Sequence, residues 1–126
     1  MAKYKIQRAR GREGSTIYAY EAAGHFECVP TRLFDKEGGG ANEIEGAKVI
    51  MGITYFVPGG NTAFASNPME SIYYILEGQM TLKVEDEEPT VLQAGDSFHC
   101  VGGVTKSVCN EGETTTKMLV VLLPPQ

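Results

Sequence analysis

Along most of the chain, short apolar stretches alternate with turns that contain glycine, proline or asparagine. The stretches are rich in β-branched and aromatic residues and are shorter than typical helices, which favours strands. Short strands at regular spacing indicate a β-sandwich or a closed barrel, so the pattern predicts an all-β fold. The expected strands cover residues 17–20, 26–34, 48–57, 62–65, 71–76, 79–84, 90–92, 97–101, 106–109 and 115–123.

The turns suggest where the chain is interrupted. Residues 58–61, Pro-Gly-Gly-Asn, are expected to stop the strand before them. Residues 35–47 are rich in glycine and charge, and we interpret them as a mobile connector, with a lid over a pocket as the alternative. No internal repeat is present. We therefore expect one barrel domain at residues 17–126, preceded by an N-terminal arm at residues 1–16.

Composition narrows the function classes. The chain has 126 residues, enough for one core, and a formal net charge of -5, which disfavours a nucleic-acid-binding surface. No stretch has the roughly 20 apolar residues of a membrane span, and the N-terminus lacks the apolar core of a signal peptide. Three cysteines without CxxC spacing fit a reduced compartment. A cytoplasmic protein that binds neither membrane nor nucleic acid is expected.

The arm differs from the rest of the chain because it is basic. Its charge comes from Lys3, Lys5, Arg8, Arg10 and Arg12. Such a run is typical of a solvated tail or an edge strand protected from aggregation. The alternative is an arm that binds an anion or an acidic partner.

Two groups of residues carry a family resemblance. Residues 58–60 (Pro-Gly-Gly) and 73–78 (Tyr-Tyr-Ile-Leu-Glu-Gly) resemble the start and end of the first cupin motif. Residues 95–96 (Gly-Asp), Gly103 and Asn110 resemble the second. The resemblance covers residues 58–110. It implies a double-stranded β-helix, that is, a jelly-roll barrel with an internal pocket.

The chain departs from this family at the metal site. Metal-binding cupins use two histidines and a glutamate from the first motif and one histidine from the second. The corresponding stretches here hold Ala65, Ser66, Asn67 and Ser71, with Glu70 one residue away, and Lys106 in the second motif, where Val101 also replaces a proline. A protonated lysine has no lone pair for a metal ion. The chain has only two histidines, so we expect neither metal nor other cofactor.

Lys106 is the main candidate for chemistry. If it keeps the direction of the histidine that it replaces, it points into the barrel. There it could bind a carboxylate, act as a general base, or form a Schiff base with a carbonyl. The alternative is a lysine at the barrel mouth, with its stem buried and its ammonium in water.

Other candidates lie close to Lys106 in the predicted barrel. Ser71 and Tyr73 share strand parity and are expected on the interior face, and Asn67 replaces a family ligand. We therefore predict Lys106, Ser71, Tyr73 and Asn67 as ligand-binding residues. Glu70 and His99 join Lys106 as catalytic candidates. His99 is expected to face outward if its neighbours Phe98 and Cys100 face the core.

These residues favour a metal-independent barrel that binds a small, polar, anionic organic molecule. The first alternative is an isomerase, epimerase or lyase acting on a carbonyl-containing metabolite, with Lys106 working beside Glu70, Tyr73 or His99. The second is a structural or regulatory dimer, in which Met51, Phe56, Phe64 and Met80 would fill the pocket. We expect a homodimer in each case, because closed two-fold pairing is the commonest assembly.

Overall fold

The computed structural model describes residues 3–125. Residues 1–2 of the predicted arm and residue 126 of the predicted barrel lie outside the described residues. The described part contains strands and no helix, which confirms the all-β prediction. It follows that this part holds no helix able to cross a membrane. The strands are β1 (Tyr18–Ala19), β2 (His25–Phe34), β3 (Ile50–Thr62), β4 (Glu70–Glu77), β5 (Gln79–Val84), β6 (Thr90–Gln93), β7 (Ser97–Cys100), β8 (Lys106–Cys109) and β9 (Thr116–Leu123).

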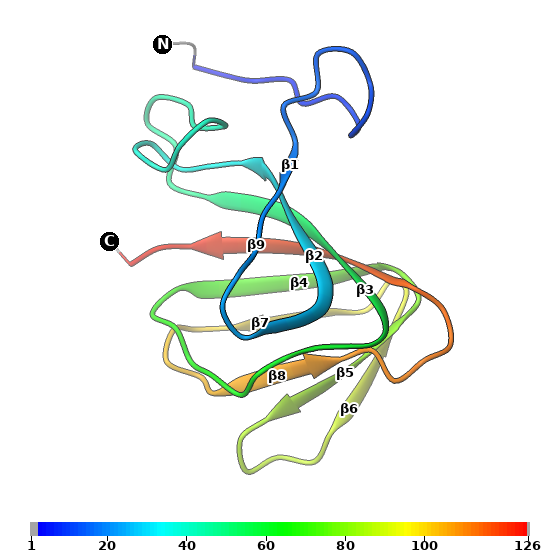
Figure 1. Ribbon diagram of the computed structural model, residues 1–126. Helices are drawn as coiled ribbons and strands as arrows, with labels where there is room; N and C mark the ends of the chain where they lie inside the picture. The colour runs from blue at the N-terminus through cyan, green and yellow to red at the C-terminus, as the bar shows by residue number, and fades with distance from the viewer. Residues whose placement is uncertain (1–2, 126) are drawn as a thin grey trace.

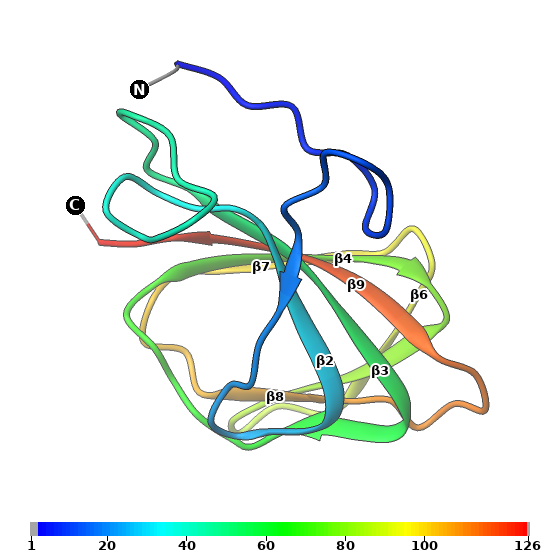
Figure 2. The ribbon, with the colours of Figure 1, turned by 45° about the horizontal axis from the view of Figure 1, so that its top comes forward.

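The strands curl into an antiparallel barrel. Their order is β6-β5-β8-β3-β9-β4-β7, and β2 pairs with β3 while β1 pairs with β2. The long strand β3 joins the two halves, because it pairs with β9 over Ile50–Phe56 and with β8 at Asn61. Figure 2 shows β2 and β3 side by side on one wall, and Figure 1 shows β5, β6 and β8 at the end away from the arm.

Alternation along the strands separates the core from the surface. In β3 the residues Ile50, Gly52, Thr54 and Phe56 are buried, whereas the residues between them are less so. This is the period of two that a half-buried strand requires. The buried core contains Phe56, Ile75, Met80, Leu82, Leu92, Val108 and Met118.

The prediction that residues 58–61 stop a strand is wrong, since β3 continues to Thr62. The chain accommodates Pro58 by a bulge: Phe26 pairs with Asn61, but Cys28 already pairs with Phe56. The residues between are therefore outside the regular ladder, where a proline is tolerated. Gly59 adopts φ 87°, which side-chain-bearing residues rarely do.

Asn110 holds this bulge against the second motif. Its side-chain amide donates to the carbonyl oxygens of Phe56 (2.9 Å) and Thr114 (2.8 Å), and its Oδ1 accepts from the backbone N–H of Gly112. Its backbone also exchanges hydrogen bonds with Gly59 and Gly60. The start of the first motif and the end of the second are thus one structural unit.

The strand expected at residues 62–65 is also not formed. Thr62 ends β3, and Ala65 makes only an isolated bridge, exchanging backbone hydrogen bonds with Lys106 of 3.1 and 3.2 Å. This bridge has a consequence for the site. It holds the segment after β3 beside the start of β8, where Lys106 lies.

Segment 35–47, which we interpreted as a mobile connector, is tied to the arm by one buried side chain. Asn42 donates to the carbonyl oxygens of Thr16 and Arg32 and accepts from the Thr16 hydroxyl and from Lys5 Nζ. Gln7 adds hydrogen bonds to Thr16 and to the Leu33 carbonyl. Arm and segment lie together at one end of the molecule (Figure 1).

Candidate functional site

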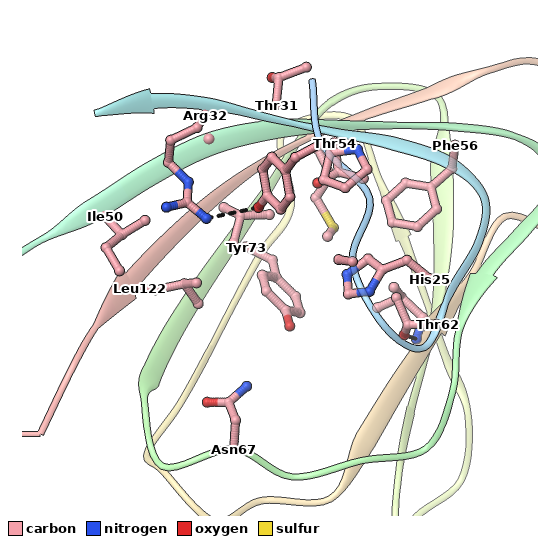
Figure 3. Close-up of a pocket in the computed structure, with 17 residues that line it drawn as sticks. His25, Thr31, Arg32, Ile50, Thr54, Phe56, Thr62, Asn67, Tyr73 and Leu122 are labelled. Atoms are coloured by element: carbon pink, nitrogen blue, oxygen red, sulfur yellow. Dashed lines mark hydrogen bonds between the residues drawn. The ribbon is translucent and has the colours of Figure 1, made fainter. Parts of the chain in front are cut away.

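The barrel contains a cavity of 170 Å³. Taking about 30 Å³ per water molecule, it has room for roughly six waters, or a small organic molecule. Its walls come mainly from β2, β3 and β9 (Figure 3). The lining includes Tyr20, His25, Thr31, Arg32, Ile50, Thr54, Phe56, Thr62, Asn67, Tyr73, Val108, Met118, Val120 and Leu122.

A second cavity of 120 Å³ adjoins the first and contains Lys106. The two cavities share His25, Thr62, Asn67 and Tyr73 in their linings, so they are neighbouring parts of one interior space. In Figure 3 the Tyr73 hydroxyl points toward Asn67, between the two ends of this space. The lining residues of both cavities include no aspartate or glutamate.

Lys106 is buried, with 7% of its surface exposed, and it lines the smaller cavity. Its Nζ lies 5.7 Å from the centroid of the Tyr73 ring, a cation–π distance. None of the ion pairs among residues 3–125 involves Lys106. An ammonium that is largely removed from water is unfavourable unless another group compensates it. Lys106 thus lies in the interior without a carboxylate partner among the described residues.

Tyr73 stands beside Lys106 as a neutral hydrogen-bonding group. Burial, with a smaller contribution from nearby Cys100, raises the pKa of Tyr73 to about 12. Desolvation has this effect because it disfavours the charged phenolate. At neutral pH the hydroxyl therefore keeps its proton. It can donate one hydrogen bond to a ligand, but it is a poor base.

The raised pKa of Tyr73 has a consequence for stability. A group whose pKa is higher in the folded state stabilises the protein below its unfolded pKa, and this contribution is lost as the pH rises. We expect the free energy of unfolding of wild type to fall by about 2 to 3 kcal/mol as the pH rises from 10.0, the ordinary pKa of tyrosine, to about 12. The free energy of unfolding of Tyr73→Phe, measured by urea unfolding, should fall by less over the same pH range. The matched control is Tyr74→Phe, on the exposed face; equal losses in all three proteins would contradict the prediction.

Asn67 and Ser71 occupy different environments. Asn67 lines both cavities, although its Oδ1 already accepts the backbone N–H of Met69. Ser71 is fully buried on the interior side of β4, as its parity predicts, but it lines neither cavity. Its Oγ has no hydrogen-bond partner. The structure thus places Asn67 at the site and Ser71 behind it.

Glu70 and His99 do not join Lys106. Glu70 Oε2 and His99 Nε2 are 2.5 Å apart, and the two side chains are 44% and 55% exposed. They alternate with the interior residues Ser71 and Cys100, so they lie on the outer face of β4 and β7. The outward direction of His99 agrees with the predicted alternation. The suggested pairing of Glu70 with Lys106 is not formed.

Sequence reasoning missed the contribution of β2 and the segment before it. Arg32 lines the larger cavity and donates to Asp35 Oδ2 (2.8 Å) and to the Tyr20 hydroxyl (3.0 Å). Burial lowers the pKa of Arg32, but Tyr20 and Asp35 more than offset this and leave it raised. The signal in the sequence was an arginine inside an otherwise weakly charged strand.

Comparison with known proteins identifies the class. The family described as "Cupin domain" matches residues 52–122, more than half of the chain, and this chain belongs to that family. The fold is accordingly the expected cupin jelly roll.

Among curated proteins, the chain is 29% identical over 106 residues to Beta-D-galactosidase Rv1717 of Mycobacterium tuberculosis, covering 84% of this chain and 86% of that protein. Among solved structures, it resembles the polyketide cyclase RemF of Streptomyces resistomycificus (TM-score 0.74, 18% identity, 96% and 81% of the two chains). It also resembles an RmlC-like cupin of Shewanella frigidimarina (TM-score 0.67, 19% identity, 95% of each chain).

The residues at the family's metal-ligand positions do not fit a metal ion. Ala65 and Lys106 offer no lone pair, and Ser71 and Asn67 offer only neutral oxygens, which bind transition metals weakly. Within residues 3–125 no group of three histidine, cysteine, aspartate or glutamate side chains is placed to hold one. No chemical step at this site is therefore assigned to a metal.

Proposed function

We propose that this protein is a metal-independent cupin that binds a small organic anion inside its barrel. The observation that carries the proposal is Lys106, a buried residue that lines the interior and is unpaired with any carboxylate of the described chain. An anion placed there would replace the hydration that the ammonium loses on burial. Tyr73 and Asn67 would orient it by hydrogen bonds.

The cavity supports binding rather than a purely structural role. Phe56 and Met80 are packed into the core, but Phe64 is 55% exposed and does not fill the interior. Space remains beside Lys106, and it is lined by a few polar groups set among apolar ones, which is typical of small-molecule sites.

The test is a calorimetric titration of the purified protein with short straight-chain carboxylates and with the matching primary amides. We expect the carboxylates to bind and the amides, which have the same shape without the charge, to bind at least about tenfold more weakly. Equal affinity for acid and amide would overturn the proposal.

The alternative enzyme has less support from the geometry. An isomerase, epimerase or lyase needs an acid and a base within reach of the same substrate. Tyr73 is near Lys106, but Glu70 and His99 are on the outer face. A lysine and a neutral tyrosine could polarise a carbonyl, but neither predicted base lies beside them. The side chain that could act as a base there is His25, which lines both cavities.

The cavity does not support for this chain the galactosidase activity for which one relative is named. Glycoside hydrolysis usually requires two carboxylates that flank the scissile bond. The lining residues of both cavities contain none. A hydroxylated acid related to a sugar remains compatible as a ligand, so for this chain we propose binding rather than hydrolysis.

Metal independence is the first consequence that can be measured. We expect elemental analysis of protein purified without chelators to find far less than one transition metal per chain, because Lys106 replaces a ligand and repels cations. About one zinc, manganese, iron or nickel per chain, lost together with ligand binding, would contradict this. The carboxylate titration repeated in a chelator should give an unchanged affinity.

We also propose that the chain forms a homodimer through its arm. Lys5 and Gln7 are hydrogen-bonded to the body of the protein. The alternate residues of the arm, Tyr4 and Ile6, are 73% and 64% exposed. A basic arm with outward apolar side chains is complementary to the acidic surface of a second copy. The partner is therefore another copy of this chain.

Light scattering at micromolar concentration should give about twice the chain mass of 13.7 kDa. The double variant Tyr4→Ser/Ile6→Ser should shift the mass toward the monomer. The exposed pair Val91→Ser/Val101→Ser, away from the arm, is the control and should not. A monomeric wild type would contradict the proposal.

A further inference from the structure

The interior has a positively charged group near each end, but the two differ in how their charge is compensated. Lys106 lines the smaller cavity and Arg32 lines the larger one. Arg32 forms an ion pair of 2.8 Å with Asp35, whose side chain is 3% exposed. A buried ion pair of this kind is nearly neutral as seen from the cavity. The interior therefore presents one net positive charge rather than two.

Between these ends the wall combines apolar side chains with neutral hydroxyl groups such as those of Thr54 and Thr62, and it holds no carboxylate. In Figure 3 Ile50 and Leu122 lie beside Arg32, and Phe56 lies toward His25 and Thr62. Val108, Met118 and Val120 also contribute to the larger cavity. A charged group in this stretch would lose hydration without meeting a carboxylate or a further lysine or arginine. The body of a ligand must accordingly be uncharged.

Arg32 still has donors to offer at its end. One Nη donates to Asp35 and the other donates to the Tyr20 hydroxyl, whereas a guanidinium carries five N–H groups. The guanidinium also lies 4.9 Å from the Tyr20 ring centroid, which fixes its position. A hydroxyl or carbonyl oxygen can accept one of the remaining N–H groups. A second carboxylate there would instead be repelled by Asp35.

From this asymmetry we propose that the ligand is a monoanion: its acidic group binds Lys106, and its far end carries a neutral hydrogen-bond acceptor that binds Arg32. This inference rests on the proposed function and adds the selectivity of the same site. Asp35 is a specificity-determining residue, although it lies outside the cavity lining, because it cancels the charge of Arg32. The site thereby selects hydroxy or oxo monocarboxylates over dicarboxylates.

The test is a matched series of straight-chain acids from butanoate to octanoate. Each length is supplied as the plain acid, the ω-hydroxy acid and the α,ω-dicarboxylate, and is titrated calorimetrically into the whole protein. At the best chain length the hydroxy acid should bind at least as tightly as the plain acid. It should bind at least about tenfold more tightly than the dicarboxylate, because the second carboxylate of the dicarboxylate would be repelled by Asp35.

Asp35→Asn should reduce or reverse the preference for the hydroxy acid, because it releases the charge of Arg32. Glu45→Gln is the control: it makes the same change in net charge at a half-exposed carboxylate of the same segment, and it should leave the preference unchanged. The wild-type ratio decides the question even if Asp35→Asn does not fold.

The outcomes separate the two proposals. If no acid binds, the proposed function and this inference both fail. If the acids bind and Lys106→Met abolishes that binding, but the dicarboxylate binds as tightly as the hydroxy acid, only the inference of a monoanion is overturned. If Asp35→Asn folds and keeps the wild-type preference, the role of Asp35 is overturned.

Discussion

Replacing Lys106 with methionine should weaken carboxylate binding by about 30- to 150-fold, while the fold is retained. The loss corresponds to roughly 2 to 3 kcal/mol, the range for a hydrogen bond to a charged group. Methionine preserves much of the volume of the lysine stem and removes a charge rather than leaving one unpaired. The melting temperature without ligand should therefore stay the same or rise.

Lys83→Met is the matched control for this experiment. Lys83 lies on β5, where it pairs with Ser107, the residue after Lys106, but it lines neither interior cavity. Because Lys83 is only half-buried and lies outside both cavities, its substitution should change carboxylate affinity by less than about 1 kcal/mol. Calorimetric titration and thermal melting give both quantities. If Lys106→Met changes neither binding nor melting, Lys106 has no role in the site.

The period of two along the strands explains why much of the interior was predictable. Ser71, Tyr73 and Ile75 alternate with exposed or half-buried residues in β4, so a single inward residue fixes its neighbours on either side. The same argument turned His99 outward from the apolar character of Phe98 and Cys100. The local sequence pattern is sufficient to predict side-chain direction wherever a strand has one solvent-exposed face and one buried face.

Arg32 and Asp35 were not predictable in the same way. Arg32 reaches the site because β2 pairs with β3 in the wall that lines the cavity, and no local sequence pattern predicts which strands line it. The neutralisation of Arg32 depends on a carboxylate that the composition assigned to a flexible connector. Asn42 was hidden for the same reason: glycine content predicts a loop, but not that one amide in it makes four hydrogen bonds.

The misplaced end of β3 has a comparable cause. Pro58 removes a donor, and a proline followed by two glycines ordinarily ends a strand. Here Asn110, distant in sequence, supplies hydrogen bonds that replace the missing ladder. The interaction is non-local, so the sequence around Pro58 does not reveal it.

Asn110→Ala should therefore destabilise the protein by about 3 kcal/mol or more. Asn110 is fully buried, and its removal leaves the carbonyl oxygens of Phe56 and Thr114 and the N–H of Gly112 without their partner. Each buried group that loses its hydrogen bond costs about 1 to 3 kcal/mol, reduced where water can enter. The contact between the bulge in β3 and the turn after β8 would be weakened, because both are hydrogen-bonded to this side chain.

Asn61→Ala provides the comparison within the same bulge. Asn61 makes one exposed side-chain hydrogen bond, to the carbonyl oxygen of Gly59, so its loss should change stability by no more than about 0.5 kcal/mol. Urea unfolding of both variants and wild type, followed by circular dichroism, measures the difference. A similar small effect for the two substitutions would show that the bulge is held by its backbone alone. A large effect confined to Asn110→Ala would establish that the second motif stabilises the first through this one amide.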